Sequence, residues 1–126
     1  HVTGADGGYM VGGNRYAPDV AYISYERQRE LATQGYNPNP PELAVEVISD
    51  PNNADEQHKL RLNLSSYLAV GVIVWVVNPF NRTIEIHEVG REARVIDKNG
   101  ELTGGSVLPE FTLSVKDIFP PEEATE

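Results

Sequence analysis

Two acidic residues and one lysine are the side chains of this sequence best suited to chemistry. Glu46 lies inside the mostly apolar segment 42–48, where a carboxylate is costly unless it is paired, protonated or bound to a metal ion. Asp19 precedes a second apolar segment, 20–24, and Lys59 lies early in a predicted helix. Two carboxylates can hold Mg²⁺ through oxygen, and an ammonium group can orient a water molecule. Together these groups favour metal-assisted hydrolysis of a phosphodiester.

Each of these residues also has an ordinary structural interpretation. Glu46 could face solvent or pair with an arginine, and Asp19 could form a turn after Pro18. Lys59 could be an exposed helix residue that pairs with Asp55, one helical turn earlier. The elements that carry the three residues therefore have to bring them together before they can share a reaction.

The segments around Glu46 and Lys59 predict a strand, a helix and a second strand in succession. Residues 42–48 predict a buried strand because they are mostly apolar and are bounded by prolines. Apolar residues recur at helical spacing from Asn53 or Ala54 to Val70, and an asparagine precedes them as a cap. Residues 72–77 predict the next strand. This order is a βαβ unit, whose two strands should be parallel.

Shorter elements are predicted on both sides of the βαβ unit. Residues 26–31 favour a turn or two of helix, 34–41 a loop and 98–101 a turn. Strands are predicted at 9–11, 20–24, 83–89 and 93–96, with a last apolar segment at 107–114. The strand 83–89 should form a hairpin with 72–77 and make the sheet mixed. We expect one α/β (α+β) domain over residues 1–119 and an acidic disordered tail over 120–126.

The composition of the chain limits its partners. Ten Lys and Arg against nineteen Asp and Glu give a net charge of −9 in 126 residues, so nucleic acid cannot be held by bulk positive charge. Any phosphate contact must be local. Cysteine is absent, which excludes disulfides and thiolate metal sites, and the three histidines lack zinc-site spacing. The apolar run 70–77 is too short to cross a membrane, and we expect a cytoplasmic protein. The cations nearest the candidate residues in sequence are Arg15, Arg27, Arg29, Lys59 and Arg61.

The chain also resembles a known family in the order of its motifs. The motifs are Tyr16-Ala-Pro-Asp-Val-Ala-Tyr-Ile-Ser24, Pro41-Glu-Leu-Ala-Val-Glu-Val-Ile-Ser49, the helix residues Lys59 and Tyr67 with Gly71, Val74-Trp-Val-Val-Asn-Pro79 and Leu108-Pro-Glu-Phe-Thr-Leu-Ser114. In this order they resemble the Uma family of bacterial restriction endonucleases, within the PD-(D/E)xK, restriction-endonuclease-like superfamily. Several motifs in one order are more specific than any one of them.

The resemblance implies a DNA endonuclease that depends on Mg²⁺ or Mn²⁺ and has a restriction-endonuclease-like mixed sheet with a flanking helix. It implies that Asp19, Glu46 and the carbonyl of Val47 are metal ligands and that Lys59 is the catalytic lysine. The superfamily's usual lysine lies two residues after the acidic residue, where this chain has Ile48. Family members usually begin several dozen residues earlier, so we expect an N-terminally incomplete domain.

A second hypothesis is a non-catalytic interaction or structural module that keeps the nuclease-like fold. The net acidity, Ile48 and the shortened N-terminus favour it. Geometry separates the two, because a nuclease needs Asp19, Glu46 and Lys59 at one cleft. We also expect a homodimer, since strand edges need cover and cutting two DNA strands benefits from two sites.

Overall fold

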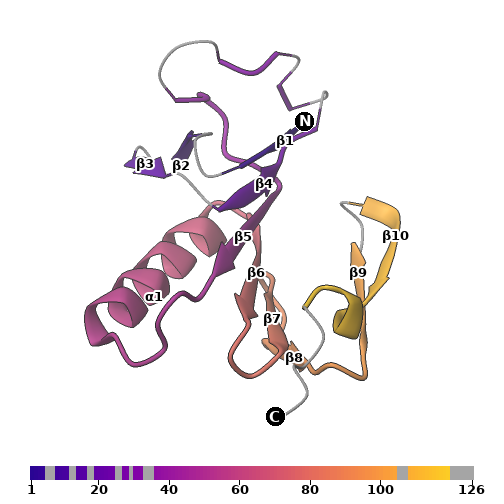
Figure 1. Cartoon of the computed structure of the whole chain (residues 1–126). Helices are drawn as coiled ribbons and strands as arrows, with labels where there is room; N and C mark the ends of the chain where they lie inside the picture. Colours follow the sequence, from indigo (N-terminus) through magenta and orange to yellow (C-terminus); the bar gives the residue numbers. More distant parts are fainter. Residues whose placement is uncertain are drawn as a thin grey trace.

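The computed structural model describes residues 1–4, 8–11, 14–16, 19–24, 27–28, 30–32, 36–104 and 108–119. Within these ranges a six-stranded sheet carries one helix on one face and a small hairpin on the other (Figure 1). The sheet consists of β1 (Val2–Thr3), β4 (Val20–Tyr22), β5 (Leu43–Val47), β6 (Ile73–Asn78), β7 (Thr83–His87) and β8 (Arg94–Ile96), in that spatial order. The other elements are β2 (Tyr9–Val11), β3 (Asn14–Tyr16), α1 (Ala54–Ala69), β9 (Glu101–Gly104), β10 (Leu108–Ser114) and a 3-10 helix (Val115–Asp117).

The strands of the main sheet are both parallel and antiparallel. β5 and β6 are parallel, as the βαβ pattern predicts, and β6 forms an antiparallel hairpin with β7. β4 pairs with the other edge of β5 in the antiparallel sense. The mixed α+β fold is therefore confirmed, with β5 and β6 at its centre.

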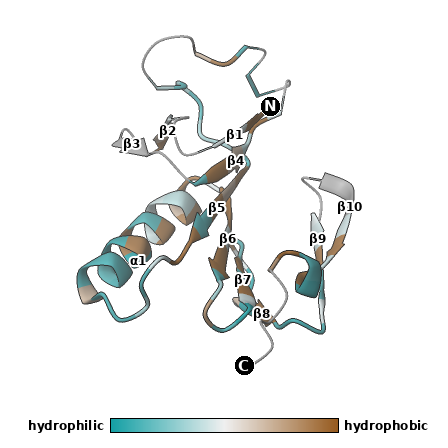
Figure 2. Cartoon of the chain, viewed as in Figure 1, coloured by the Kyte–Doolittle hydropathy of each residue, from teal (hydrophilic) through white to brown (hydrophobic). Residues whose placement is uncertain are grey.

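The two faces of the sheet are buried by different elements. Ala44, Val74 and Val76 face α1 and pack with Leu64 and Tyr67 of that helix. The alternate residues of the sheet face the other side, where Leu43, Trp75, Ile84 and Ile86 pack with Leu102 of β9 and Val115 of the 3-10 helix. Burial on both faces explains why β6 is hydrophobic along most of its length, whereas α1 mixes apolar and hydrophilic residues (Figure 2).

Helix α1 begins and ends where local chemistry predicts. The Asn53 side chain caps it by accepting a hydrogen bond from the Glu56 N–H at 3.0 Å. At the other end Gly71 has a φ of +83°, a left-handed conformation that glycine adopts without a steric penalty. The first turn of the helix lies near the carboxyl end of β5, because Glu56 accepts hydrogen bonds from Ser49.

One local prediction is wrong, and one strand was not predicted. Residues 27–28 and 30–31 are not helical; Gln28 is instead buried and hydrogen-bonded to Asn37 at 2.7 Å, and this tertiary contact outweighs helix propensity. β9 was not predicted, because Leu102 is its only large apolar residue.

Some sequence predictions fall outside the described residues. Pro18, Val107 and the tail 120–126 are among them, so the domain boundary at residue 119 stays a prediction. Within the described part of the chain, no helix is long and apolar enough to cross a membrane.

Candidate active site

The pairing of β4 with β5 brings Asp19 beside Glu46. Ala21 opposes Ala44 in this antiparallel pair, so the same register continued by two residues places Asp19 opposite Glu46. Opposite residues project to the same face of a sheet. Ala21 and Ala44 both lie in the core under α1, and the two carboxylates therefore project to the helix side.

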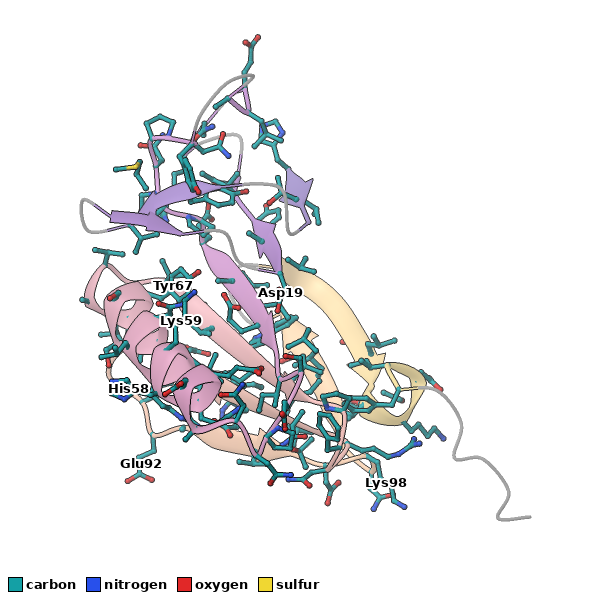
Figure 3. All side chains as sticks on the ribbon, turned by 60° about the vertical axis from the view of Figure 1, so that its left-hand side comes forward. Asp19, His58, Lys59, Tyr67, Glu92 and Lys98 are labelled. Carbon is teal, nitrogen blue, oxygen red and sulfur yellow. The ribbon has the colours of Figure 1, made fainter. Side chains whose placement is uncertain are left out.

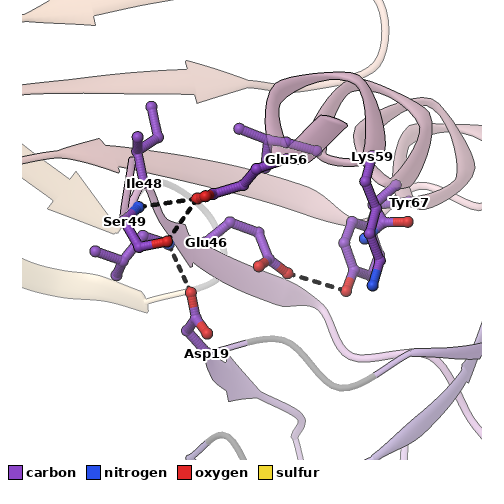
Figure 4. Close-up of a pocket in the computed structure, with 10 residues that line it drawn as sticks. Asp19, Glu46, Ile48, Ser49, Glu56, Lys59 and Tyr67 are labelled. Atoms are coloured by element: carbon purple, nitrogen blue, oxygen red, sulfur yellow. Dashed lines mark hydrogen bonds between the residues drawn. The ribbon is translucent and has the colours of Figure 1, made fainter. Parts of the chain in front are cut away.

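Among the described residues, one hydrogen bond is donated to each of the two carboxylates. Oδ2 of Asp19 accepts a bond from the Val47 N–H at 2.7 Å, and the Tyr67 hydroxyl donates to Oε1 of Glu46 at 3.2 Å (Figure 4). A strand residue directs its N–H and C=O toward the same neighbouring strand. The Val47 carbonyl therefore points to the edge of β5 where Asp19 lies.

One face of α1 forms the opposite wall of the site. Glu56, Lys59, Asn63 and Tyr67 follow each other at intervals of three or four residues, which places them on one side of a helix. Together with Asp19 and Glu46 they line a cavity of about 450 Å³. Lys59 and Tyr67 lie on the side of α1 that faces the sheet and Asp19 (Figure 3).

The electrostatics of Glu46 differ from those of an ordinary surface carboxylate. Burial and the nearby charge of Asp19 raise the pKa of Glu46 from 4.5 to about 7, although the Tyr67 hydrogen bond and the Lys59 charge act in the opposite direction. The two carboxylates thus repel each other more strongly than one lysine compensates. A bound cation would relieve that repulsion.

Glu56 joins the helix to the chain segment that leaves β5. Its Oε1 accepts hydrogen bonds from the Ser49 hydroxyl at 2.7 Å and the Ser49 N–H at 3.0 Å. These bonds lower the pKa of the Glu56 carboxyl, which stays ionised. Sequence reasoning did not assign this contact, although glutamate three residues after an Asn cap is a capping signal. Here the carboxylate reaches Ser49, and the cap N–H of Asn53 donates to the Asp50 carbonyl at 3.2 Å.

The structure brings the predicted site residues Asp19, Glu46, Val47 and Lys59 to one cavity. Among the ion pairs in the described part of the chain, none joins Lys59 to Asp55, the alternative partner considered for this lysine. The histidines do not join the cavity. In the described ranges, the candidate site included, no group of three His, Cys, Asp or Glu side chains is placed to hold a metal ion.

Of the other cations considered for phosphate binding, Arg27 and Arg61 have described side chains, and neither lines this cavity. Arg61 pairs with Glu85 at 3.2 Å, and Arg27 lies 3.8 Å from Glu42. Burial raises the pKa of Glu85, but hydrogen bonds from Arg61 and His87 outweigh it, so the net shift is downward. The side chains of Arg15 and Arg29 lie outside the described residues. Lys59 is therefore the cation that lines the cavity among those whose side chains are described.

Comparisons with known proteins identify the fold and the family of this chain. A crystal structure from Anabaena variabilis ATCC 29413, described as "a putative nuclease belonging to DUF820", matches with a TM-score of 0.76 and 21% sequence identity. The match covers 94% of this chain and 66% of that one, and at this identity it establishes the fold. The Uma2 family, described as "Putative restriction endonuclease", matches residues 2–116, so the chain belongs to that family. No curated protein matches the chain.

Proposed function

We propose that this chain is a divalent-metal-dependent endonuclease domain that hydrolyses phosphodiester bonds of DNA. The observation that carries the proposal is the meeting of Asp19, Glu46 and Lys59 in one cavity at the carboxyl end of β5. Family membership supports a nuclease function. The proposed substrate places the protein in the bacterial cytoplasm.

The donors at this cavity suit Mg²⁺ or Mn²⁺. Asp19 and Glu46 supply carboxylate oxygens, and the Val47 carbonyl points to the same strand edge. Magnesium is commonly held by one or two carboxylates with water in its remaining positions. Among the described residues, one oxygen of each carboxylate accepts a hydrogen bond, and the second oxygen would bind the cation. A bound divalent cation would supply Lewis acidity and offset negative charge on the phosphate.

Lys59 supplies the positive charge of the chain itself at this cavity. Its ammonium can donate a hydrogen bond to the attacking water or to a phosphate oxygen, and it offsets charge that develops on phosphorus. The superfamily's usual lysine lies on the strand, at the position that Ile48 occupies here. In this chain Lys59, which belongs to α1, takes the role of that lysine. The buried Ile48 instead packs in the core under the helix.

A non-catalytic module with the same fold is the second candidate. Two observations favour it: the net charge of −9, and the pairing of Arg27 and Arg61 with carboxylates of the protein. Such a module would keep the metal site without cleaving DNA. Binding and cleavage therefore have to be measured separately.

Nicking of a supercoiled plasmid tests the proposed function, with Mn²⁺ titration by calorimetry as the binding measurement. We expect metal-dependent nicking that EDTA abolishes, and loss of both binding and nicking in Asp19→Asn. The control is Asp97→Asn, because Asp97 also accepts a backbone hydrogen bond, from Asn99 at 2.9 Å, but lies outside the cavity. Metal binding without nicking under any condition would favour the non-catalytic module. Nicking that persists in EDTA would contradict the metal dependence.

We also propose that the domain forms a homodimer. β1 and β8 are the edges of the six-stranded sheet, and each carries an exposed apolar side chain, Val2 (70% exposed) and Val95 (65%). Exposed strand edges favour association with a second chain. Light scattering at micromolar concentrations should give a dimer mass, and Val95→Lys or Val2→Lys should lower it if that edge is the interface. A monomer mass throughout this range would refute the proposal.

A further inference from the structure

Tyr67 is a buried aromatic residue whose hydroxyl reaches the candidate metal site. Only 1% of its surface is exposed, and its ring packs in the core between α1 and the sheet. Its hydroxyl donates a hydrogen bond to Oε1 of Glu46 at 3.2 Å (Figure 4). Among the described residues, Tyr67 is the donor to this carboxylate. The ring is thus fixed by packing, and its polar end touches a candidate ligand.

We propose that Tyr67 is a positioning residue of this site, which holds Glu46 so that its second carboxylate oxygen stays available to a divalent cation beside Asp19. This inference rests on the proposed function. A glutamate side chain has three rotatable bonds, and ordering it during metal binding costs conformational entropy. The Tyr67 hydroxyl is already fixed by the helix and the core. Its hydrogen bond therefore orders Glu46 when the chain folds, so less entropy is lost when the metal binds.

The arrangement at Asp19 supports the same interpretation. There the Val47 N–H holds one carboxylate oxygen at 2.7 Å, so both candidate ligands have one oxygen bound to a rigid part of the fold. The donor differs because Asp19 lies next to the backbone of β5, whereas Glu46 extends from β5 toward the helix. A short side chain can use a backbone donor, but Glu46 needs a donor from α1.

Tyr9 provides a matched control for the hydroxyl of Tyr67. It belongs to the same core cluster, is 0% exposed, and has its hydroxyl 2.9 Å from Oγ1 of Thr3. It does not line the cavity. Tyr9→Phe and Tyr67→Phe therefore remove the same buried, hydrogen-bonded group from the same core, and they differ in whether Glu46 loses a partner.

Calorimetric titration with Mn²⁺ compares the two variants with the unchanged chain. We expect Tyr67→Phe to raise the Kd for Mn²⁺ about tenfold or more, as loss of a group that orients a metal ligand commonly does. Tyr9→Phe should leave the Kd unchanged. In the nicking assay, Tyr67→Phe should need a correspondingly higher Mn²⁺ concentration, and its rate should recover at saturating metal. Thermal melting checks that both variants stay folded.

The outcomes separate this inference from the proposed function. If the unchanged chain binds Mn²⁺ and nicks DNA while Tyr67→Phe shows the same Kd, Tyr67 has no positioning role and the proposed function stands. Equal weakening in Tyr9→Phe and Tyr67→Phe would assign the effect to the core and also overturn the inference. If the unchanged chain neither binds Mn²⁺ nor nicks DNA, the proposed function fails and the inference fails with it.

Discussion

Lys59→Ala is expected to reduce metal-dependent DNA cleavage by about 100- to 1000-fold, the usual loss when a group that stabilises charge in the transition state is removed. Among the side chains that the structure describes, Lys59 is the cation that lines the cavity, opposite two carboxylates that leave the site with excess negative charge. Binding of Mn²⁺ should not weaken, because the ammonium repels a cation. The single-turnover nicking rate at saturating metal measures the effect.

The stability of the Lys59→Ala variant should hardly change. The side chain is exposed, forms none of the ion pairs found in the described residues, and lies inside α1, where alanine is the best helix former. Lys116→Ala is the control, since Lys116 is exposed and lies outside the cavity. Full metal-dependent cleavage by Lys59→Ala would show that this lysine is an ordinary surface charge.

Glu46→Gln is expected to have opposite effects on stability and on metal binding. At pH 8 the variant should be more stable, with a free energy of unfolding about 1 to 3 kcal/mol higher than that of the unchanged chain. The reason is that the variant no longer holds a charge in a partly buried site beside Asp19. The same substitution removes a ligand, so Mn²⁺ should no longer raise the melting temperature. Urea unfolding and melting curves with and without Mn²⁺ measure the two effects.

The pH dependence of this stability difference follows from the raised pKa. Glu46 ionises near 4.5 when unfolded and near 7 when folded, so the folded state binds more protons between these values. The contribution of Glu46 to stability is therefore fully present below pH 4.5 and is lost as pH rises through about 7. The gain from Glu46→Gln should be small at pH 4 and reach its full size by pH 8.

Glu92→Gln is the control for this pH dependence, because Glu92 is exposed and lies outside the cavity. It should show no such difference between pH 4 and pH 8. An unchanged stability of Glu46→Gln across this range would mean that Glu46 is hydrated like a surface residue. That result would show that burial and Asp19 do not raise the pKa of Glu46, whether or not the variant also lost cleavage.

Local patterns in the sequence predicted most of the elements that carry the site. The strands 43–47 and 73–78 are mostly apolar, and the helix 54–69 has apolar residues at helical spacing; prolines, asparagine or glycine lie at their ends. β9 lacks such a period, since Leu102 is its one large apolar residue. It was missed because its pairing with β10, rather than its own pattern, makes it a strand.

The sequence by itself determined which residues are chemically suited to the site. A carboxylate in an apolar strand is unusual at any position, so Glu46 can be recognised without a structure. Asp19 and Lys59 were also recognised as suitable groups, and the resemblance to the family, based on colinear motifs, implied their roles as metal ligand and catalytic lysine. Both are single residues with common structural roles, and nothing in their local sequence distinguishes those roles from chemistry.

Only the tertiary structure decided that these residues meet and which groups hold them. The position of Asp19 beside Glu46 depends on the register between β4 and β5, which are separated in sequence by residues 23–42. The hydrogen bonds from Tyr67 to Glu46 and from Ser49 to Glu56 join α1 to β5 and to the segment that leaves it. Strand register and helix packing are set by the sum of many long-range contacts, and a one-residue slip would turn Asp19 to the opposite face.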